Sequence, residues 1–346
     1  MSGSRHLVVD LAATEAVWAL RDDDARAIRR AAPPDWRVTV LDTPAVSNGD
    51  GGGRTNAAAL AAVRDAEVYV GFGISRALFG AALELRWAHS AAAGVGGLLF
   101  PELVASPVLV SNSAGVHAAP IAETVLAGVL SLLRGLDLAA AAQRSGEWDR
   151  QPFVDAASPV RELGECRVLV VGAGGIGGEI ARRCAAFGAA CTGVRRRPEQ
   201  GAPPGFARVV GQDELDAELP NADVLVIAAP ATGATEGLID ARRLDLLPAG
   251  AIVVNVARGS LLDEEALVER AVEGRLRGAV LDVFREEPLP LASPLWRVPS
   301  IIITPHVSAV SPRRFWSRGV PLLLDNWARY RAGARLRNLV DKHAGY

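Results

Sequence analysis

Cysteine, lysine and methionine are scarce in this chain of 346 residues, and their scarcity excludes several kinds of protein. The three cysteines, Cys166, Cys184 and Cys191, have neither an even count nor the spacing of metal ligands. We therefore expect reduced core thiols in a cytoplasmic protein, and no metal site. Lys342 is the only lysine, so an arginine at any one surface position carries little functional information.

Long uncharged apolar runs and an excess of one charge are also missing. The most apolar stretch, 118–142, is interrupted by Glu123, Arg134 and Asp137, which indicates a buried or interface helix and no membrane span. The formal net charge is only -2, whereas a nucleic-acid-binding protein would carry a basic excess on one face. The N-terminus lacks the layout of a signal peptide. A soluble cytoplasmic protein without nucleic acid or membrane partners is the expectation.

Short apolar runs alternate with alanine-rich stretches along the whole chain, which is long enough for two domains. Strands that alternate with helices predict a parallel sheet, and continuous Val/Ile/Leu/Ala runs predict strands buried on both faces. Five runs in the first block are predicted strands: 5–10, 36–42, 67–72, 85–90 and 108–113. Six runs in the second block match the strand count of a doubly wound dinucleotide-binding domain: 167–172, 190–195, 223–230, 251–257, 278–284 and 300–306.

The helices predicted between and after these strands suggest how the domains are arranged. They include 14–31, 75–82, a long helix at 117–143 that tolerates Pro120 in its first turn, and a final helix at 312–332. The final helix is expected to return to the first domain and make it discontinuous. The predicted division is a first domain of 1–112 and 310–346, and a second of 113–309. The segment 47–56 is predicted to be an exposed loop.

A glycine fingerprint follows the first strand of the second block, at the start of a helix. It is Gly172-Ala173-Gly174-Gly175-Ile176-Gly177, in the pattern G-x-G-x-x-G. The first glycine allows a tight turn, the second lets the backbone approach a pyrophosphate, and the third allows close packing of strand and helix. The helix N-terminus then offers oriented N–H groups to the phosphates. This segment is the predicted dinucleotide site.

The next strand predicts which nicotinamide cofactor fits. An NAD site ends this strand with an acid that holds the ribose 2′-hydroxyl, but here the strand is followed by Arg195, Arg196 and Arg197. Guanidinium groups can bind a 2′-phosphate bidentately, whereas a carboxylate would repel it. We predict a preference for NADP(H), with NAD(H) possible. Three solvent-exposed arginines in an arginine-rich protein are the alternative interpretation.

Three later segments each place one reactive side chain at a strand end: Arg258, Glu287 and His306. The planar fork of Arg258 can bind the carboxylate and keto oxygens of a 2-keto acid together. A histidine ordinarily titrates near neutrality, so His306 can donate a proton to the carbonyl oxygen. Glu287 is the expected partner that fixes the imidazole tautomer. Alone, His306 could equally be a core or turn histidine, and Glu287 an exposed loop carboxylate.

The segments GAGGIGGEIARR, NVARGSLLDEEALVERAVEGRLRGAVLDVFREEPLP and TPHVSA resemble the D-isomer-specific 2-hydroxyacid dehydrogenase family. The resemblance implies a Rossmann cofactor domain inserted into a smaller flavodoxin-like α/β substrate domain. It also implies substrate-binding, histidine-orienting and acid/base roles for Arg258, Glu287 and His306.

The resemblance extends to further cofactor contacts. It places the carboxylate of Asp282 against the nicotinamide amide. It implies that Val256 and Ala257 line the nicotinamide, that Pro230 lies beside the adenosine portion and that Ser308 belongs to the cofactor site.

Substrate contacts are implied in two other places. The loop containing Gly94, Val95 and Gly96 is similar to the one whose backbone N–H groups bind the substrate carboxylate, although the family often has an aspartate in place of Gly96. SGEW and the three arginines are similar to the glyoxylate/hydroxypyruvate reductase branch, in which the tryptophan at the position of Trp148 reaches a neighbouring subunit's site. A buried packing role is the alternative for Trp148.

The resulting hypothesis is an NADPH-dependent reductase that converts a small glyoxylate- or hydroxypyruvate-like 2-keto acid to the D-2-hydroxy acid. A phosphoglycerate-type dehydrogenase is one alternative, although the chain ends soon after His306 and leaves no room for a regulatory domain. A non-catalytic, NAD(P)-sensing protein similar to transcriptional co-repressors is another. The apolar helix within 118–142 is expected to pair with its twin in a homodimer.

Overall fold

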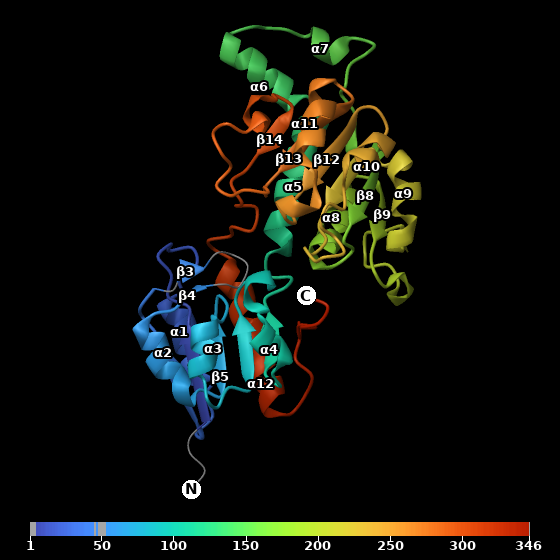
Figure 1. The fold of residues 1–346 in the computed structure, drawn as a ribbon. Helices are drawn as coiled ribbons and strands as arrows, with labels where there is room; N and C mark the ends of the chain where they lie inside the picture. The colour runs from blue at the N-terminus through green and yellow to red at the C-terminus, as the bar shows by residue number, and fades with distance from the viewer. Residues whose placement is uncertain (1–4, 45, 48–52, 346) are drawn as a thin grey trace. The chain divides into compact units, whose positions relative to one another are not determined.

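The computed structural model describes residues 5–44, 46–47 and 53–345. Its contacts divide the chain into two compact units. We call residues 1–117 with 310–346 the terminal unit, and residues 118–309 the central unit (Figure 1). Each is an α/β unit built on a parallel sheet.

The terminal unit contains the five strands that the sequence predicts. They are β1 (Arg5–Asp10), β2 (Trp36–Val40), β5 (Val68–Gly71), β6 (Trp87–Ser90) and β7 (Leu109–Asn112). Their order in the sheet is β2-β1-β5-β6-β7, and all neighbours are parallel. This is the 2-1-3-4-5 order of flavodoxin-like folds, so the predicted fold of this part is confirmed.

Successive side chains of these strands point alternately to the two faces of the sheet, and a hydrophobic core lies on each face. Leu7, Val9 and other residues of the first face pack with α1 (Asp22–Arg30) and α12 (Phe315–Arg331), and the α12 residue Trp327 is fully buried there. The opposite face packs on three short helices, α2 (Ala57–Ala62), α3 (Arg76–Ala81) and α4 (Pro101–Ala105). The period of two along each strand explains why these runs are apolar throughout.

Two features of the terminal unit differ from, or add to, the sequence prediction. The helix expected over 14–31 begins only at Asp22. The segment before it forms turns, because the backbone N–H of Leu20 donates to the carbonyl of Leu11 instead of to a helical partner. The segment 47–56, predicted to be a loop, includes Ser47 of β3 (Val46–Ser47) and the whole of β4 (Gly53–Arg54), which form an antiparallel pair, while 48–52 lie outside the described residues.

The only lysine of the chain fastens its C-terminal segment. The ammonium of Lys342 donates to the carbonyl oxygens of Leu103, Ser106 and Val108, at 3.0, 2.6 and 3.1 Å. Three converging acceptors match the three donors of an ammonium better than the flat fork of a guanidinium. Burial lowers the pKa of Lys342.

The central sheet has one strand more than the sequence predicts. Its order is β10-β9-β8-β11-β12-β13-β14, all parallel, so the predicted doubly wound sheet is confirmed. The additional strand, β10, is only three residues long, which is too short to show a pattern. The bounds are β8 (Arg167–Val171), β9 (Ala190–Val194), β10 (Arg208–Val210), β11 (Val224–Ile227), β12 (Ala251–Asn255), β13 (Leu276–Leu281) and β14 (Ile301–Ile303).

Both faces of this sheet are covered by helices. One face, which includes Val168 and Val226, packs against a core shared with α5 (Ala118–Leu133) and α8 (Gly175–Ala186). The opposite face, which includes Leu169 and Ile227, packs against a core that also contains residues of the helices α9 (Leu215–Glu218), α10 (Ala241–Leu246) and α11 (Glu264–Val272). Cys166, Cys184 and Cys191 are buried and free, as expected.

The prediction of one long helix over 117–143 is wrong, because the segment forms two helices. It is α5 followed by α6 (Leu136–Ser145), bent by 67° at Gly135, which adopts a left-handed conformation (φ 67°). The carboxylate of Asp137 holds the bend because it pairs with Arg277 at 2.6 Å, and the same guanidinium binds the carbonyl of Leu132. The two charged side chains are only 10% and 9% exposed.

Among the described helices, none is by itself long and apolar enough to cross a membrane. Only α5 and α6 taken together reach that length and apolarity, and they are sharply bent against one another.

Candidate active site

Three neighbouring strands of the central sheet deliver the three predicted catalytic side chains to one edge. Arg258 follows β12, Glu287 lies in the loop after β13, and His306 follows β14. Because β12, β13 and β14 are parallel neighbours, their carboxyl ends open on the same side. Open parallel sheets place their ligands at this edge.

His306 and Glu287 form a direct pair. Nδ1 of His306 lies 2.7 Å from Oε2 of Glu287, and the two side chains are 36% and 34% exposed. The other carboxylate oxygen of Glu287 accepts the backbone N–H of Phe284 at 2.9 Å. Glu287 is thus fixed to its own loop while it holds the ring, which leaves Nε2 as the imidazole atom that can face a substrate.

The backbone around Arg258 is fixed by a residue that the sequence analysis did not single out. Asn255, buried at the end of β12, donates to the carbonyl of Arg258 at 3.0 Å and accepts from the N–H of Ala257 at 3.0 Å. The guanidinium of Arg258 donates to the carbonyl of Ala257 at 2.6 Å and is partly exposed. The sequence signal for Asn255 would have been an amide that ends an otherwise apolar strand.

At Gly259 the loop that carries Arg258 packs directly against the loop that carries Glu287. A Cβ at this position would overlap the backbone of Phe284 and Arg285. Only glycine allows the two loops to lie in contact there.

Asp282 is almost completely buried at 1% exposure, directly after β13. It accepts hydrogen bonds from the hydroxyl of Thr304 at 2.6 Å and from the N–H of Val307 at 2.9 Å. The N–H and hydroxyl of Ser308 also donate to it. The contact predicted between Asp282 and a nicotinamide stays a prediction, as does the cofactor role of Ser308. Thr304 was missed, although a hydroxyl after a buried strand is a usable signal.

The glycine fingerprint has the geometry that its pattern predicts. Gly172 has a φ of 109°, and a Cβ there would lie 2.6 Å from the backbone of Ala228. A Cβ on Gly177 would overlap the carbonyl of Gly172. In contrast, nothing lies within 4 Å of a Cβ built on Gly174, the exposed residue that precedes α8. The backbone is therefore open where a pyrophosphate would approach. Gly175 is exposed and Ile176 is partly buried in the first turn of α8.

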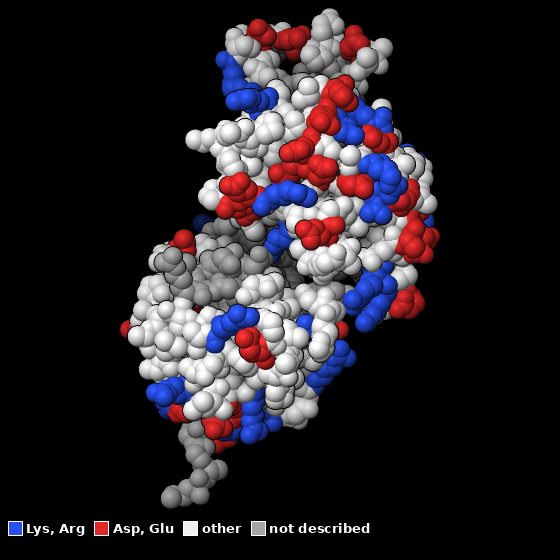
Figure 2. Space-filling model, viewed as in Figure 1, with Lys and Arg blue, Asp and Glu red and all other residues white. Residues whose placement is uncertain are grey.

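The three arginines after β9 separate into two environments. Arg195 is partly buried and donates to the carbonyl of Gly201 at 3.3 Å and to the side chain of Gln200 at 2.5 Å. Arg196 and Arg197 are exposed. Acidic and basic side chains are intermixed on the face of the central unit that Figure 2 shows.

The remaining predicted cofactor residues also lie at the carboxyl edge of the central sheet. Val256 and Ala257, after β12, are 5% and 7% exposed. Pro230, shortly after β11, is exposed, and its carbonyl accepts the hydroxyl of Thr235 at 2.7 Å.

In the terminal unit, the loop after β6 is held by residues at the end of β7. The side chain of Asn112 donates to the carbonyl of Ala93 at 2.7 Å, and the N–H of Ser113 donates to the carbonyl of Ala92 at 3.1 Å. Val95 is buried, Gly94 is partly buried and Gly96 is exposed. The loop predicted to bind a carboxylate is thus anchored from a neighbouring strand.

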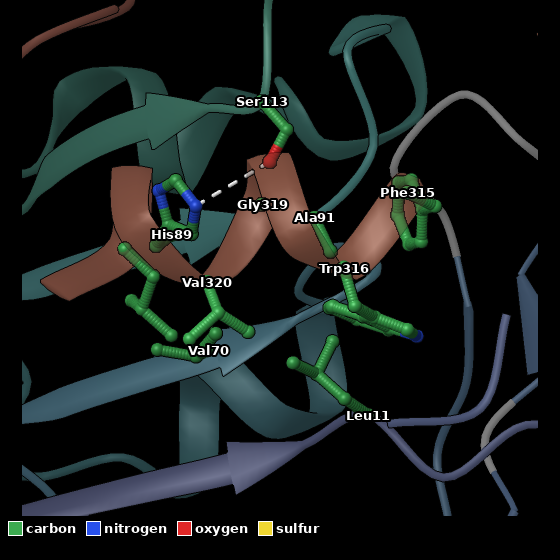
Figure 3. Close-up of a pocket in the computed structure, with 10 residues that line it drawn as sticks. Leu11, Val70, His89, Ala91, Ser113, Phe315, Trp316, Gly319 and Val320 are labelled. Carbon is green, nitrogen blue, oxygen red and sulfur yellow. Dashed lines mark hydrogen bonds between the residues drawn. The ribbon is translucent and has the colours of Figure 1, made fainter. Parts of the chain in front are cut away.

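A buried histidine lies at the end of the strand that leads into this loop. Nδ1 of His89 is 2.8 Å from the hydroxyl of Ser111, and Ser113 approaches its Nε2 at 3.4 Å beside a small apolar cavity (Figure 3). The cavity, lined in part by Leu11 and Trp316, has a volume of about 10 Å³, room for one water at most. Burial lowers the pKa of His89 to about 4.

Trp148 lies between α6 and α7 (Gln151–Val154) and is 93% exposed. The alternative of a buried packing tryptophan is therefore wrong. Leu136 and Val154, on the same projecting part of the central unit, are 56% and 61% exposed.

Comparison with known proteins places this geometry in a family. The model of the family described as D-isomer specific 2-hydroxyacid dehydrogenase, NAD binding domain, matches residues 126–308. A glyoxylate/hydroxypyruvate reductase A of Salmonella paratyphi B is 37% identical over 184 residues, which are 53% of this chain and 57% of that relative. The match thus spans little more than half the length of this curated relative.

Solved structures that resemble the whole chain include the following two. One is a D-isomer specific 2-hydroxyacid dehydrogenase from Xanthobacter autotrophicus Py2 in complex with NADPH and MES, 30% identical, with a TM-score of 0.79 and coverage of 99% of this chain and 100% of that one. The other is an NADPH-dependent glyoxylate/hydroxypyruvate reductase from Sinorhizobium meliloti in complex with NADP and sulfate, 27% identical, with a TM-score of 0.76 and the same coverage. The family model matches more than half of the length of this chain, so the chain belongs to the D-isomer-specific 2-hydroxyacid dehydrogenase family.

Proposed function

We propose that this protein is an NADPH-dependent reductase that converts a small 2-keto acid to the D-2-hydroxy acid. The observation that carries the proposal is the His306–Glu287 hydrogen bond at 2.7 Å, at the same sheet edge as Arg258. A proton donor with its orienting carboxylate and a guanidinium are the groups that a developing alkoxide and a carboxylate require.

The central unit has a backbone suited to a dinucleotide. Gly172 and Gly177 are packed too closely for any side chain, while the Cβ direction of Gly174 is open. These glycines, with the first turn of α8, would hold the pyrophosphate through backbone N–H groups. When bound, the nicotinamide supplies the hydride that adds to the keto carbon.

The chain's own residues perform the remaining steps in this proposal. Arg258 binds the substrate carboxylate and polarises the keto oxygen with its two-pronged guanidinium. His306, held by Glu287 through Nδ1, gives the Nε2 proton to the oxygen on which negative charge grows. Glu287 stabilises the imidazolium before the transfer and keeps the tautomer that aims Nε2 at the substrate.

We propose NADPH as the preferred cofactor because three arginines and no acid follow β9. The exposed Arg196 and Arg197 can bind a 2′-phosphate, and Arg195 supports the loop from which they extend. The relatives from Xanthobacter autotrophicus and Sinorhizobium meliloti, whose structures contain NADPH or NADP, support the same choice.

We assign the cofactor to the central unit and substrate selection to the terminal unit. The predicted boundaries, 1–112 with 310–346 and 113–309, differ from the compact units by the five residues 113–117. The loop of Gly94, Val95 and Gly96 would bind the carboxylate through its backbone, and the exposed Gly96 in place of an aspartate leaves that end of the loop uncharged. Glyoxylate and hydroxypyruvate are the proposed substrates, by similarity to the Salmonella paratyphi B and Sinorhizobium meliloti relatives.

A panel of 2-keto acids assayed with NADPH and with NADH tests the proposal. We expect turnover of a small keto acid, a higher kcat/KM with NADPH, and loss of measurable substrate saturation in Arg258→Ala. Oxidation of phosphoglycerate with NAD, without keto acid reduction, would support the phosphoglycerate alternative instead. Tight NADPH binding without turnover of any panel member would favour the nucleotide-sensing alternative.

We also propose that the protein forms a homodimer through the part that carries Trp148. The predicted dimer helix is in fact split: α5 packs on its own sheet and α8, whereas Leu136, Trp148 and Val154 remain exposed. An exposed apolar group of this kind marks an interaction surface. A monomeric sedimentation profile at micromolar concentration would contradict this proposal.

A further inference from the structure

We propose that Asp282 is a positioning residue that acts on His306 by fixing the turn 304–308. This inference rests on the proposed function, because it gives Asp282 a role in the same site. It differs from the contact with a nicotinamide that sequence resemblance implies.

The hydrogen bonds that the carboxylate of Asp282 accepts come from one short turn, from residues on either side of His306. Thr304 donates its hydroxyl at 2.6 Å, and Val307 donates its N–H at 2.9 Å. Ser308 donates its N–H to both carboxylate oxygens, at 3.2 and 3.1 Å, and its hydroxyl to one of them. A single carboxylate therefore satisfies the donors on both flanks of the histidine.

The turn needs such an anchor because of its backbone conformation. His306 has a φ of 54°, in the left-handed region that non-glycine residues rarely adopt, and its N–H bonds to the carbonyl of Thr304 only two residues away. Such a conformation persists only when its surroundings determine it. Glu287 fixes the ring of His306, but it makes no bond to the backbone of the turn among the contacts described. Asp282 supplies those bonds.

The burial of Asp282 also supports this role. The residue is 1% exposed, and both carboxylate oxygens already accept hydrogen bonds from the turn. A charge that is buried in this way is stabilised by its donors, which are part of the protein. Asp282 and Glu287 thus act on His306 in complementary ways, because the first sets where its backbone lies and the second sets where its ring points.

Two sets of variants test the proposal. Asp282→Ala removes every bond between the carboxylate and the turn, while Thr304→Val combined with Ser308→Ala keeps the carboxylate and removes both hydroxyl donors. The measurements are kcat and KM for the keto acid, the Kd of NADPH from its fluorescence, and hydrogen exchange of the Val307 and Ser308 amides. We expect Asp282→Ala to lower kcat by about 10²-fold, because small misplacements of a catalytic group have effects of this size.

NADPH binding and amide protection separate this role from a direct cofactor contact. We expect the Kd of NADPH to change by no more than about threefold in Asp282→Ala, and amide protection at 307 and 308 to be lost. The double variant is expected to lower kcat in the same direction. Strongly weakened NADPH binding with unchanged amide protection would overturn the proposal, and so would a wild-type kcat in the double variant.

Asp282→Asn keeps the test decisive if the alanine variant does not fold. Its amide oxygen can still accept the N–H groups of the turn, so its kcat should lie between that of the wild type and that of Asp282→Ala. A loss of NADPH affinity alone in Asp282→Asn would refute the anchor. If the wild-type protein reduces no 2-keto acid, the proposed function fails, but the exchange measurement still decides whether Asp282 holds the turn.

Discussion

The imidazole of His306 and the carboxylate of Glu287 are joined at 2.7 Å across 19 residues of sequence, from loops that follow two neighbouring strands. Removal of the proton donor in His306→Ala should therefore lower kcat by roughly 10²- to 10⁴-fold, the usual contribution of a positioned acid. NADPH affinity should stay near that of the wild type, because the variant leaves the glycine loop intact. Steady-state kinetics and NADPH titration check this. A wild-type rate in the variant would end the proton-donor assignment.

Glu287→Gln tests the carboxylate partner of His306. Glutamine keeps the shape of the side chain and an acceptor for the N–H of Phe284, but it removes the charge that stabilises the imidazolium. We expect a loss in kcat that is smaller than that of His306→Ala, with little change in KM. A larger loss in Glu287→Gln than in His306→Ala would contradict an orienting role.

The exposed arginines after β9 should control the choice of cofactor. Replacing Arg196 and Arg197 together by serine removes two potential partners of a 2′-phosphate, and each charge-assisted hydrogen bond lost weakens binding by about 1.5–3 kcal/mol. We expect the Kd of NADPH to rise at least tenfold, by that estimate, and the Kd of NADH to change little. Arg195→Lys is the companion variant that tests the supporting residue. Equal losses for both cofactors would show that the arginines do not read the 2′-phosphate.

The buried pair of Asp137 and Arg277 should be essential for the bend between α5 and α6. Asp137→Asn leaves a guanidinium that is only 9% exposed without its counter-charge, which typically costs about 3–5 kcal/mol. Asp245→Asn is a suitable control, because that carboxylate is 52% exposed where it pairs with Arg270, and water screens such a pair, so its loss should destabilise the protein far less. Denaturant unfolding of both variants measures the difference. Equal stabilities would mean that the bend does not depend on the pair.

His89 should make the protein less stable as the pH falls. Its pKa in the folded protein is lowered from 6.5 to about 4 by burial, so the unfolded chain takes up a proton first. The stability is complete above pH 6.5 and is lost between 6.5 and about 4, to a total on the order of 3 kcal/mol. His89→Gln should flatten this dependence. Identical pH profiles for His89→Gln and the wild type would refute the assignment.

The sequence predicted those features whose causes are local or periodic. Strands buried on both faces show continuous apolar runs, and the residues that end them, such as Arg258 and His306, could be located at a sheet edge from sequence alone. Gly172 and Gly177 could be predicted because their roles depend on a fixed spacing within one turn.

The features that the sequence did not predict depend on distant partners. The ion pair beside the bend at Gly135 joins Asp137 to Arg277, which lies 140 residues further along the chain, and periodicity carries no trace of such a contact. The bonds of Asp282 to the turn 304–308 span 22 to 26 residues. The segment before Asp22 was predicted to be helical because alanine favours helices. That preference is weak, and the backbone hydrogen bond from Leu20 to Leu11 is incompatible with a continuous helix there.

Lys342 has a practical consequence for handling this protein. It is the only side-chain amine in the chain, and it is engaged with three carbonyl oxygens near the C-terminus. A lysine-specific protease therefore has a single peptide bond to attack, and amine-directed coupling to a surface or dye has a single side chain to modify. Either reaction must first withdraw the ammonium from its acceptors, so the rate at which Lys342 is labelled reports how often the C-terminal segment comes loose.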